Sequence, residues 1–135
     1  AKMVGEISRS LLVPVAAAAG ADPADAAALA EKLAGLRIFP DDDGRMNRSV
    51  VEAGGAVLVV SQFTLLGEVR RGRRPSFSAA APPEVAEPLV DLVAEHLRRA
   101  GVACATGRFR AHMEVELRND GPVTLVLDVA GGRVV

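Results

Sequence analysis

The chain has 135 residues, a size that supports one hydrophobic core, so we expect a single domain over residues 1–135. Half of the residues are hydrophobic and four are aromatic, which excludes a disordered chain and requires a core of Val, Leu and Ala. The net charge of −1 excludes a global attraction to nucleic acid, and the single cysteine, Cys104, excludes an intrachain disulfide.

The longest uncharged run, residues 10–21, is too short to cross a bilayer as a helix and is interrupted by Pro14 and Gly20. A chain with one cysteine also suits a reducing compartment. We therefore expect a soluble, cytoplasmic protein with no membrane partner.

Residues 4–15 are mostly apolar and predict a strand, in which Pro14 belongs at an edge, a bulge or the end. Asp22 and Pro23 predict the start of a helix that runs to about Leu36, because the carboxylate caps free amides and proline suits the first turn. Three leucines at helical spacing form its expected apolar stripe: Leu29, Leu33 and Leu36.

Residues 40–44 predict a turn, and their three carboxylates lack the spacing of a calcium-binding EF-hand loop. Residues 56–63 are the strongest strand pattern, and their continuous apolar run predicts a central strand buried on both faces. A second helix is expected over residues 84–100, with Pro88 in its first turns and Gly101 as its stop.

Residues 113–117 alternate between apolar and polar side chains, which predicts a half-exposed strand. Residues 123–129 predict another strand, after a tight connection over residues 119–122. The order of strand, helix, strand, helix and two or three further strands indicates the α/β class.

Ser61, Gln62 and Thr64 place three polar side chains at the end of the central strand, where α/β proteins tend to hold their sites. Ordinary hydrogen bonding at a strand end is the plain alternative. Burying these groups together nevertheless costs free energy unless partners or a ligand satisfy them.

Four arginines follow within five positions: Arg70, Arg71, Arg73 and Arg74. Their planar guanidinium groups suit phosphate contacts, and Gly72 lets the backbone approach a ligand closely. A solvated surface loop is the alternative. The short distance in sequence to the polar strand end favours phosphate binding.

A Ser-His-Asp triad has little support, because no Gly-x-Ser-x-Gly segment surrounds Ser61 or Ser76. Helical packing already explains His96, which leaves His112 as the only plausible base. The two histidines have no matching cysteine or carboxylate pattern for zinc, so we expect no metal and no cofactor.

Residues 61–65 (SQFTL) and 119–124 (NDGPVT) resemble the two signature segments of D-aminoacyl-tRNA deacylases. Further segments are similar to this family in order and spacing, so the resemblance covers residues 4–128: 44–49, 71–77, 79–82, 107–109 and 112–113. It implies a deacylase-type α/β fold with partly barrel-like sheets packed against two main helices. It also leads us to expect an amino-terminal strand with an arginine, which is missing before residues 4–7, and a small residue where Arg110 stands.

The resemblance implies hydrolysis of the ester bond of D-aminoacyl-tRNA, and of glycyl-mischarged tRNA, as a proofreading step in translation. The catalytic surface would consist of Ser61, Gln62, Phe63 and Thr64. Backbone amides around Phe63 and Thr64 would hold the carbonyl oxygen, while the ribose 2′-hydroxyl assists attack by water. Thr64 as a nucleophile is the less favoured route, because no base adjoins it in sequence.

The resemblance also implies a homodimer with its active site at the interface. The Gly121–Pro122 bond, cis in this family although the trans isomer is favoured by the sequence alone, would reach into the partner's pocket and reject an L-side chain sterically. Further contacts with the substrate and tRNA are expected from Arg71, Arg73, Arg74, Met113 and Asn119. Ser61 with Phe63 separates the chain from a related subfamily that has a trans Gly-Pro bond and acts on L-alanyl-tRNA.

Two alternatives from other classes stay open. One is a non-catalytic module that binds tRNA or a nucleotide through the same pocket. The other is an unrelated serine hydrolase, in which Ser61 or Ser76 would react with a fluorophosphonate probe.

Overall fold

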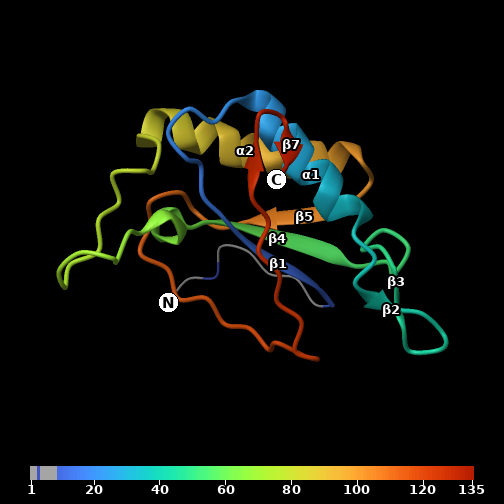
Figure 1. Cartoon of the computed structure of the whole chain (residues 1–135). Coiled ribbons are helices and arrows are strands. Elements are labelled where there is room, and N and C mark those ends of the chain that lie inside the picture. Colours follow the sequence, from blue (N-terminus) through green and yellow to red (C-terminus); the bar gives the residue numbers. More distant parts are fainter. Residues whose placement is uncertain (1–2, 4–8) are drawn as a thin grey trace.

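The computed structural model describes residue 3 and residues 9–135. Its centre is a parallel sheet in the order β1 (Ser10–Val15), β4 (Ala56–Ser61) and β5 (Ala103–Thr106). Helices α1 (Pro23–Gly35) and α2 (Pro83–Arg99) lie side by side over one face of this sheet (Figure 1). The predicted α/β class, the two helices and the central place of β4 are confirmed.

Strand β1 forms one edge of the sheet in the described part of the chain. Pro14 is exposed, one residue before the strand ends, opposite Val60 of β4. An edge is where a proline is tolerated, because its missing N–H removes no ladder bond there. The predicted strand over residues 4–15 is therefore confirmed from Ser10 onward, and its first part falls on residues 4–8, outside the described residues.

Helix α1 begins as predicted, with reciprocal capping between Asp22 and Asp25. Asp25 N donates to Asp22 Oδ1 at 3.2 Å, and Asp22 N donates to Asp25 Oδ2 at 3.1 Å. The predicted leucine stripe is partly correct: Leu33 is buried, Leu29 packs half-buried against the core, and Leu36 follows the end of the helix. The other buried residues of the helix are the small side chains Ala26 and Ala30, which the leucine spacing alone did not predict.

Helix α2 ends where the sequence predicts it. Gly101 has φ +85°, and its N–H donates to Arg98 O at 3.0 Å, while Val102 N donates to Leu97 O at 3.0 Å. These two bonds close a Schellman motif, which needs a residue in the left-handed region. Pro88 lies in the second turn on the exposed side of the helix, where it does not disturb the core.

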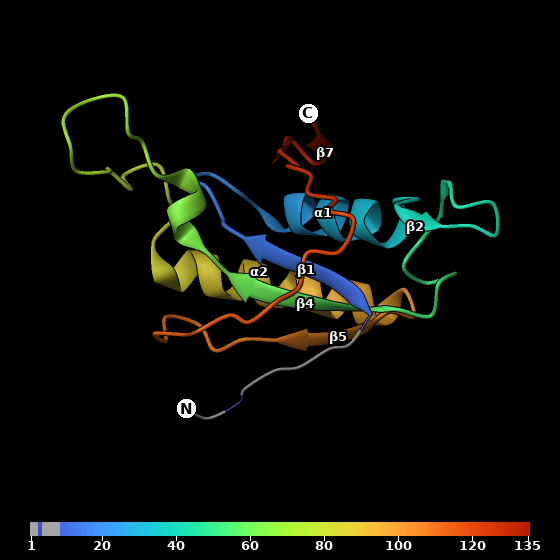
Figure 2. The same ribbon diagram turned by 90° about the horizontal axis from the view of Figure 1, so that it is seen from below.

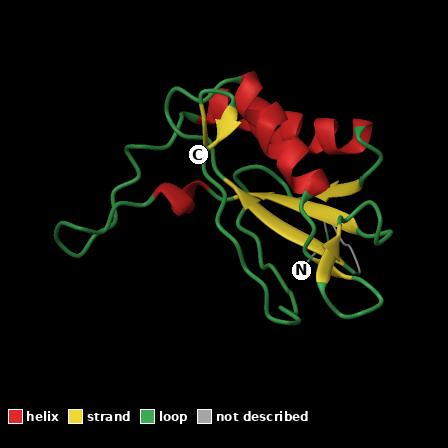
Figure 3. Ribbon diagram, turned by 45° about the vertical axis from the view of Figure 1, so that its right-hand side comes forward, coloured by secondary structure: helices red, strands yellow, loops and turns green. Residues whose placement is uncertain are grey.

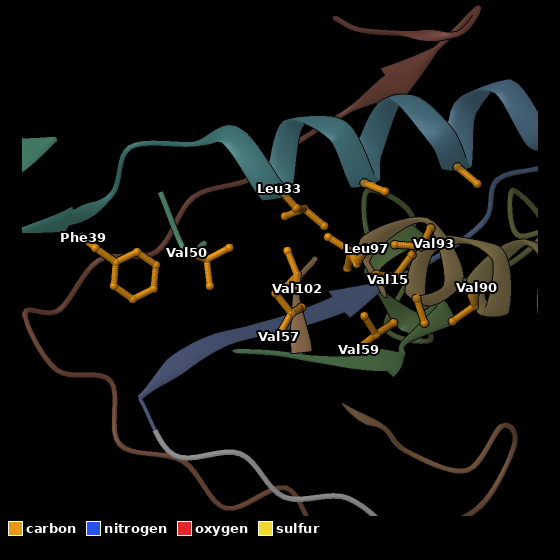
Figure 4. Close-up of a cluster of buried hydrophobic side chains, with 13 residues drawn as sticks. Val15, Leu33, Phe39, Val50, Val57, Val59, Val90, Val93, Leu97 and Val102 are labelled. Carbon is orange, nitrogen blue, oxygen red and sulfur yellow. The ribbon is translucent and has the colours of Figure 1, made fainter. Parts of the chain in front are cut away.

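The core fills the space between the sheet and the helices (Figure 4). Val57 and Val59 of β4 point into it, and Leu97 of α2 is completely buried there. Val60 points to the opposite face of the sheet and is also buried. The predicted burial of β4 on both faces is confirmed, so a rigid strand leads directly to the polar segment that follows it.

Two small hairpins flank this body. The first joins β2 (Phe39–Pro40) and β3 (Met46–Arg48), and its turn is held by Asp41, whose Oδ1 accepts from the N–H groups of Asp43 and Arg45 at 2.9 Å each. These bonds confirm the predicted turn, and the Arg45 N–H lowers the pKa of the Asp41 carboxyl. The second hairpin joins β6 (Val129–Ala130) and β7 (Arg133–Val134).

The strand predicted over residues 113–117 is wrong, and the one predicted over residues 123–129 is reduced to the start of β6. Residues 111–128 form no strand in the described chain and cross the sheet face that the helices leave open (Figure 2). Five large apolar side chains of this segment are exposed: Val115, Leu117, Val123, Leu125 and Val126. A segment with alternating side chains forms a strand only when a neighbouring strand completes its hydrogen-bond ladder, and the described residues supply no such neighbour here.

Loops lie at the edges and on the open face of the sheet, whereas the two long helices, α1 and α2, lie on the other face (Figure 3). Within the described chain, neither α1 nor α2 combines the length and the apolar character needed to cross a bilayer.

Candidate active site

The polar segment after β4 changes direction sharply. Strand β4 ends at Ser61, two residues earlier than predicted, and Gln62 N donates to Val15 O at 2.7 Å. A short 3₁₀ helix, η1 (Phe63–Leu66), follows immediately. Gln62 and the residues of η1 are called the η1 turn below.

Two backbone donors of the η1 turn are free. The N–H groups of Phe63 and Thr64 have no acceptor among the described residues, whereas Leu65 N donates to Gln62 O at 3.1 Å and Gly67 N donates to Thr64 O at 3.0 Å. Phe63 and Thr64 are exposed, so these donors are accessible to a ligand. Two adjacent N–H groups are the kind of donors that stabilise an oxyanion.

The hydroxyl of Thr64 is not activated by a base in the described chain. Its Oγ1 accepts a hydrogen bond from Gln62 Nε2, and no histidine or carboxylate is bonded to it among the described residues. An alcohol is a weak nucleophile unless a neighbouring group removes its proton. Ser76 is in a similar position, because its Oγ pairs with Ser78 Oγ at 3.2 Å.

The arginines lie on a projecting hairpin loop (Figure 1), and residues 69–75 are called the arginine loop below. Its base is closed by Glu68 N donating to Ser76 O at 2.7 Å and by Ser76 N donating to Glu68 O at 2.9 Å. Arg70 Nε lies 2.7 Å from Glu68 Oε1, which lowers the pKa of Glu68 and raises that of Arg70.

Three arginines of the loop form no ion pair with any described residue: Arg71, Arg73 and Arg74. All three are exposed. They are the three that the sequence singles out for phosphate contacts, and their guanidinium groups are available for that purpose.

Phe77, which sequence reasoning missed, packs against the η1 turn. Its ring lies edge-on to Phe63, with 5.1 Å between the ring centroids. A Cβ atom added to Gly67 would lie 2.9 Å from Phe77 Cε1, so the glycine leaves room for the ring. The only sequence signal was an apolar ring two residues after the arginine loop, together with a glycine ten positions earlier whose role the sequence does not reveal.

Met113 lies beside the end of the sheet. Gly107 N continues the ladder by donating to Val59 O at 3.1 Å. A Cβ on Gly107 would be 2.9 Å from Met113 Sδ, and this sulfur also accepts from Arg108 N at 3.4 Å. Arg110 has φ +63°, in the left-handed region that favours glycine, which accounts for the small residue expected there.

The second signature segment forms an exposed loop. The Gly121–Pro122 bond is cis, so the trans isomer that the sequence alone favours is wrong, and Asn119 Nδ2 closes the loop by donating to Thr124 Oγ1 at 2.8 Å. No hydrogen bond links this loop to the η1 turn among the described residues. The structure therefore brings Met113, but not Asn119, Gly121 or Pro122, into contact with the end of the sheet within one chain.

Two recesses of the described chain include no residue of the η1 turn. Two cavities of about 440 and 500 Å³ lie along α1, and His96 borders the first while Arg133 borders the second. Among the described residues, no group of three or more His, Cys, Asp or Glu side chains could hold a metal ion.

Comparisons with known proteins agree with the motifs. The family model described as D-Tyr-tRNA(Tyr) deacylase matches residues 1–128. A D-aminoacyl-tRNA deacylase of Roseiflexus sp. (strain RS-1) is 59% identical over 129 residues, which are 96% of this chain and 83% of that protein. The D-aminoacyl-tRNA deacylase of Heliobacterium modesticaldum is 57% identical over 96% of this chain and 86% of its own length.

Two solved structures are also similar. One, named "c-Myc DNA Unwinding Element Binding Protein", has a TM-score of 0.80 and 33% identity, and the match covers 88% of this chain and 81% of that one. The other, "Structural Analysis of a probable eukaryotic D-amino acid tRNA deacylase", has a TM-score of 0.59 and 17% identity over 75% of this chain and 74% of its own. The second likeness concerns the fold alone.

Proposed function

This chain belongs to the D-Tyr-tRNA(Tyr) deacylase family, and we propose that it hydrolyses the ester bond of D-aminoacyl-tRNA as a single catalytic domain over residues 1–135. The products are a free D-amino acid and tRNA, and glycyl-mischarged tRNA is a second substrate. The observation that carries the proposal is the pair of free N–H groups on Phe63 and Thr64 at the end of a rigid strand. The reaction serves chiral proofreading in the cytoplasm.

Ester hydrolysis develops negative charge on the carbonyl oxygen as water adds to the carbonyl carbon. The two free N–H groups stabilise that charge in the transition state, and one such donor is worth roughly 100- to 1,000-fold in rate. The ribose 2′-hydroxyl assists the attacking water. The bond between the carbonyl carbon and the ribose 3′-oxygen then breaks, and that oxygen leaves with a proton as the 3′-hydroxyl.

The side chains of Ser61, Gln62 and Thr64 shape the pocket and position the substrate. The bond from Gln62 Nε2 to Thr64 Oγ1 supports this role, because it holds the threonine side chain in place without making it more basic. A Thr64 nucleophile is the less favoured mechanism for the same reason.

Recognition of the tRNA falls to the arginine loop and to Met113 and Asn119. Arg71, Arg73 and Arg74 are exposed and free of ion pairs within the described chain, so each guanidinium group can donate two parallel hydrogen bonds to phosphate oxygens. A non-catalytic module that binds tRNA or a nucleotide is the second candidate, and the same three arginines favour it.

We also propose a homodimer in which the Gly121–Pro122 loop enters the partner's pocket. Two observations support this arrangement: the loop is exposed and makes no hydrogen bond to its own η1 turn among the described residues, and the segment that carries it exposes Val115, Leu117 and Leu125. In the dimer, the backbone of the loop leaves room for a D-side chain or glycine and collides with an L-side chain.

The decisive experiment compares release from D-Tyr-tRNA, L-Tyr-tRNA and Gly-tRNA, with the wild-type chain and Thr64→Ala side by side. Rapid, D-selective release that survives the substitution supports the mechanism assisted by the 2′-hydroxyl. Loss of release in the variant alone would make Thr64 the catalyst. Binding of D-Tyr-tRNA without turnover by either protein would leave the non-catalytic module.

A further inference from the structure

We propose that Phe77 is a positioning residue, which fixes the η1 turn so that the N–H groups of Phe63 and Thr64 face the substrate. This inference rests on the proposed function and assigns a role to two residues, Phe77 and Gly67, that lie ten positions apart in the sequence and meet in the fold. Phe77 acts through Phe63, and Gly67 provides the space in which Phe77 sits.

The contact between Phe77 and the η1 turn is specific. The two phenylalanine rings meet edge to face at 74°, the arrangement that aromatic pairs prefer. Phe63 remains 55% exposed, so the pair adds little to the hydrophobic core. What it contributes instead is a fixed orientation for the first residue of η1.

Gly67 shows that space for this ring is a requirement of the site. Its φ of −63° suits any residue, so backbone freedom does not explain a glycine here. A Cβ atom at this position would lie 2.9 Å from Phe77 Cε1 and 3.1 Å from Thr64 O. Any side chain at Gly67 must therefore displace either the ring or the η1 turn.

Phe77 is itself held from both sides along the chain. On one side, the paired N–H and C=O groups of Glu68 and Ser76 close the base of the arginine loop. On the other side, Ala19 N donates to Ala79 O at 2.9 Å, which ties the returning chain to the segment after β1. The chain on both sides of Phe77 is thus fixed by backbone hydrogen bonds.

A small rotation of the η1 turn changes the direction of both free N–H groups together. Misplacing catalytic groups by about 1 Å can cost roughly 100-fold in rate, whereas binding of the tRNA body depends on the arginine loop. Loss of the Phe77 ring is therefore expected to lower kcat and to leave KM for the tRNA nearly unchanged.

The test uses Phe77→Ala, Gly67→Ala and the double variant, with D-Tyr-tRNA as substrate. We expect each single variant to lower kcat about tenfold or more with KM changed by less than about twofold. The double variant should lose less than the two single losses combined, because the added Cβ then has no ring to displace and only its 3.1 Å contact with Thr64 O remains. Phe39→Leu is the matched control, since it alters a buried phenylalanine of β2 and should lower Tm without lowering kcat.

A second readout does not depend on turnover. In ¹H–¹⁵N NMR spectra, the residual dipolar couplings of the Phe63 and Thr64 N–H bonds, which report bond direction and not the loss of a ring current, should change in both single variants and stay in place in Phe39→Leu. Unchanged couplings with an unchanged kcat, a rise in KM alone, or additive losses in the double variant would each overturn the role of Phe77. If the wild-type chain releases nothing, the proposed function fails, while the NMR comparison still decides whether Phe77 positions the turn.

Discussion

Replacing Arg71, Arg73 and Arg74 together with alanine removes the three arginines of the loop that are free of ion pairs within the described chain. Each phosphate neutralised by a protein cation contributes about 0.7 to 0.9 to the slope of log affinity against log salt. Three contacts therefore account for a slope of about 2 to 3, or roughly a 20- to 40-fold loss of affinity as salt rises from about 50 to 200 mM. The triple variant should bind tRNA weakly and lose this part of the salt dependence.

Fluorescence anisotropy with uncharged tRNA measures the effect without interference from hydrolysis. Arg99→Ala is the matched control, because Arg99 lies on α2 and pairs with Glu95. Its slope should equal that of the wild-type chain. Arg70→Ala should fall between the two, since Arg70 is already bound to Glu68. An unchanged slope in the triple variant would refute the reasoning that these arginines contact phosphates.

Two further predictions concern stability. Arg110→Gly should raise the free energy of unfolding by about 0.5–1 kcal/mol in urea titrations, because relief of a left-handed φ of +63° exceeds the extra entropy that glycine adds to the unfolded chain; equal or lower stability would contradict this. The pKa of Glu52 is lowered below its ordinary 4.5, chiefly because Ser49 N donates to its carboxylate, so its contribution to stability is present above pH 4.5 and lost as pH falls through the lowered value. Glu52→Gln should therefore make Tm fall less steeply with acid below pH 4.5. If Tm of the variant falls in parallel with Tm of the wild-type chain, the hydrogen bond from Ser49 is not the source of this pH dependence.

The features that the sequence predicts correctly are those with local causes. Asp22 caps α1 by accepting from the N–H of Asp25, three residues away, and Gly101 ends α2 by donating to Arg98 O in the preceding turn. The apolar run of β4 is buried because Val57 and Val59 pack into the core beneath the helices, while Val60 is covered on the opposite face. Each of these signals lies within a few residues of the structure that it determines.

The predictions that were wrong depend on distant partners. Apolar and polar side chains alternate over residues 113–117, as in a strand with one buried face. A strand also needs a neighbouring strand to complete its hydrogen-bond ladder, and the described chain does not provide one there. The leucine stripe of α1 was incomplete, because the face that packs on the rest of the core also includes Ala26 and Ala30. The contact between Phe77 and Phe63 joins residues fourteen positions apart across a loop, a distance at which residue type alone gives no information.

Two glycines near the end of β4 provide space for neighbouring side chains, and backbone freedom does not explain their presence. Neither Gly67 nor Gly107 has a positive φ, yet each leaves room for a large side chain: the ring of Phe77 at one and the thioether of Met113 at the other. These two side chains approach the polar strand end from different loops, and both contacts would be lost if the glycines gained a Cβ atom. The surface around Ser61 is therefore shaped by packing against glycines, so its geometry should respond to Gly67→Ala or Gly107→Ala even though neither substitution strains the backbone.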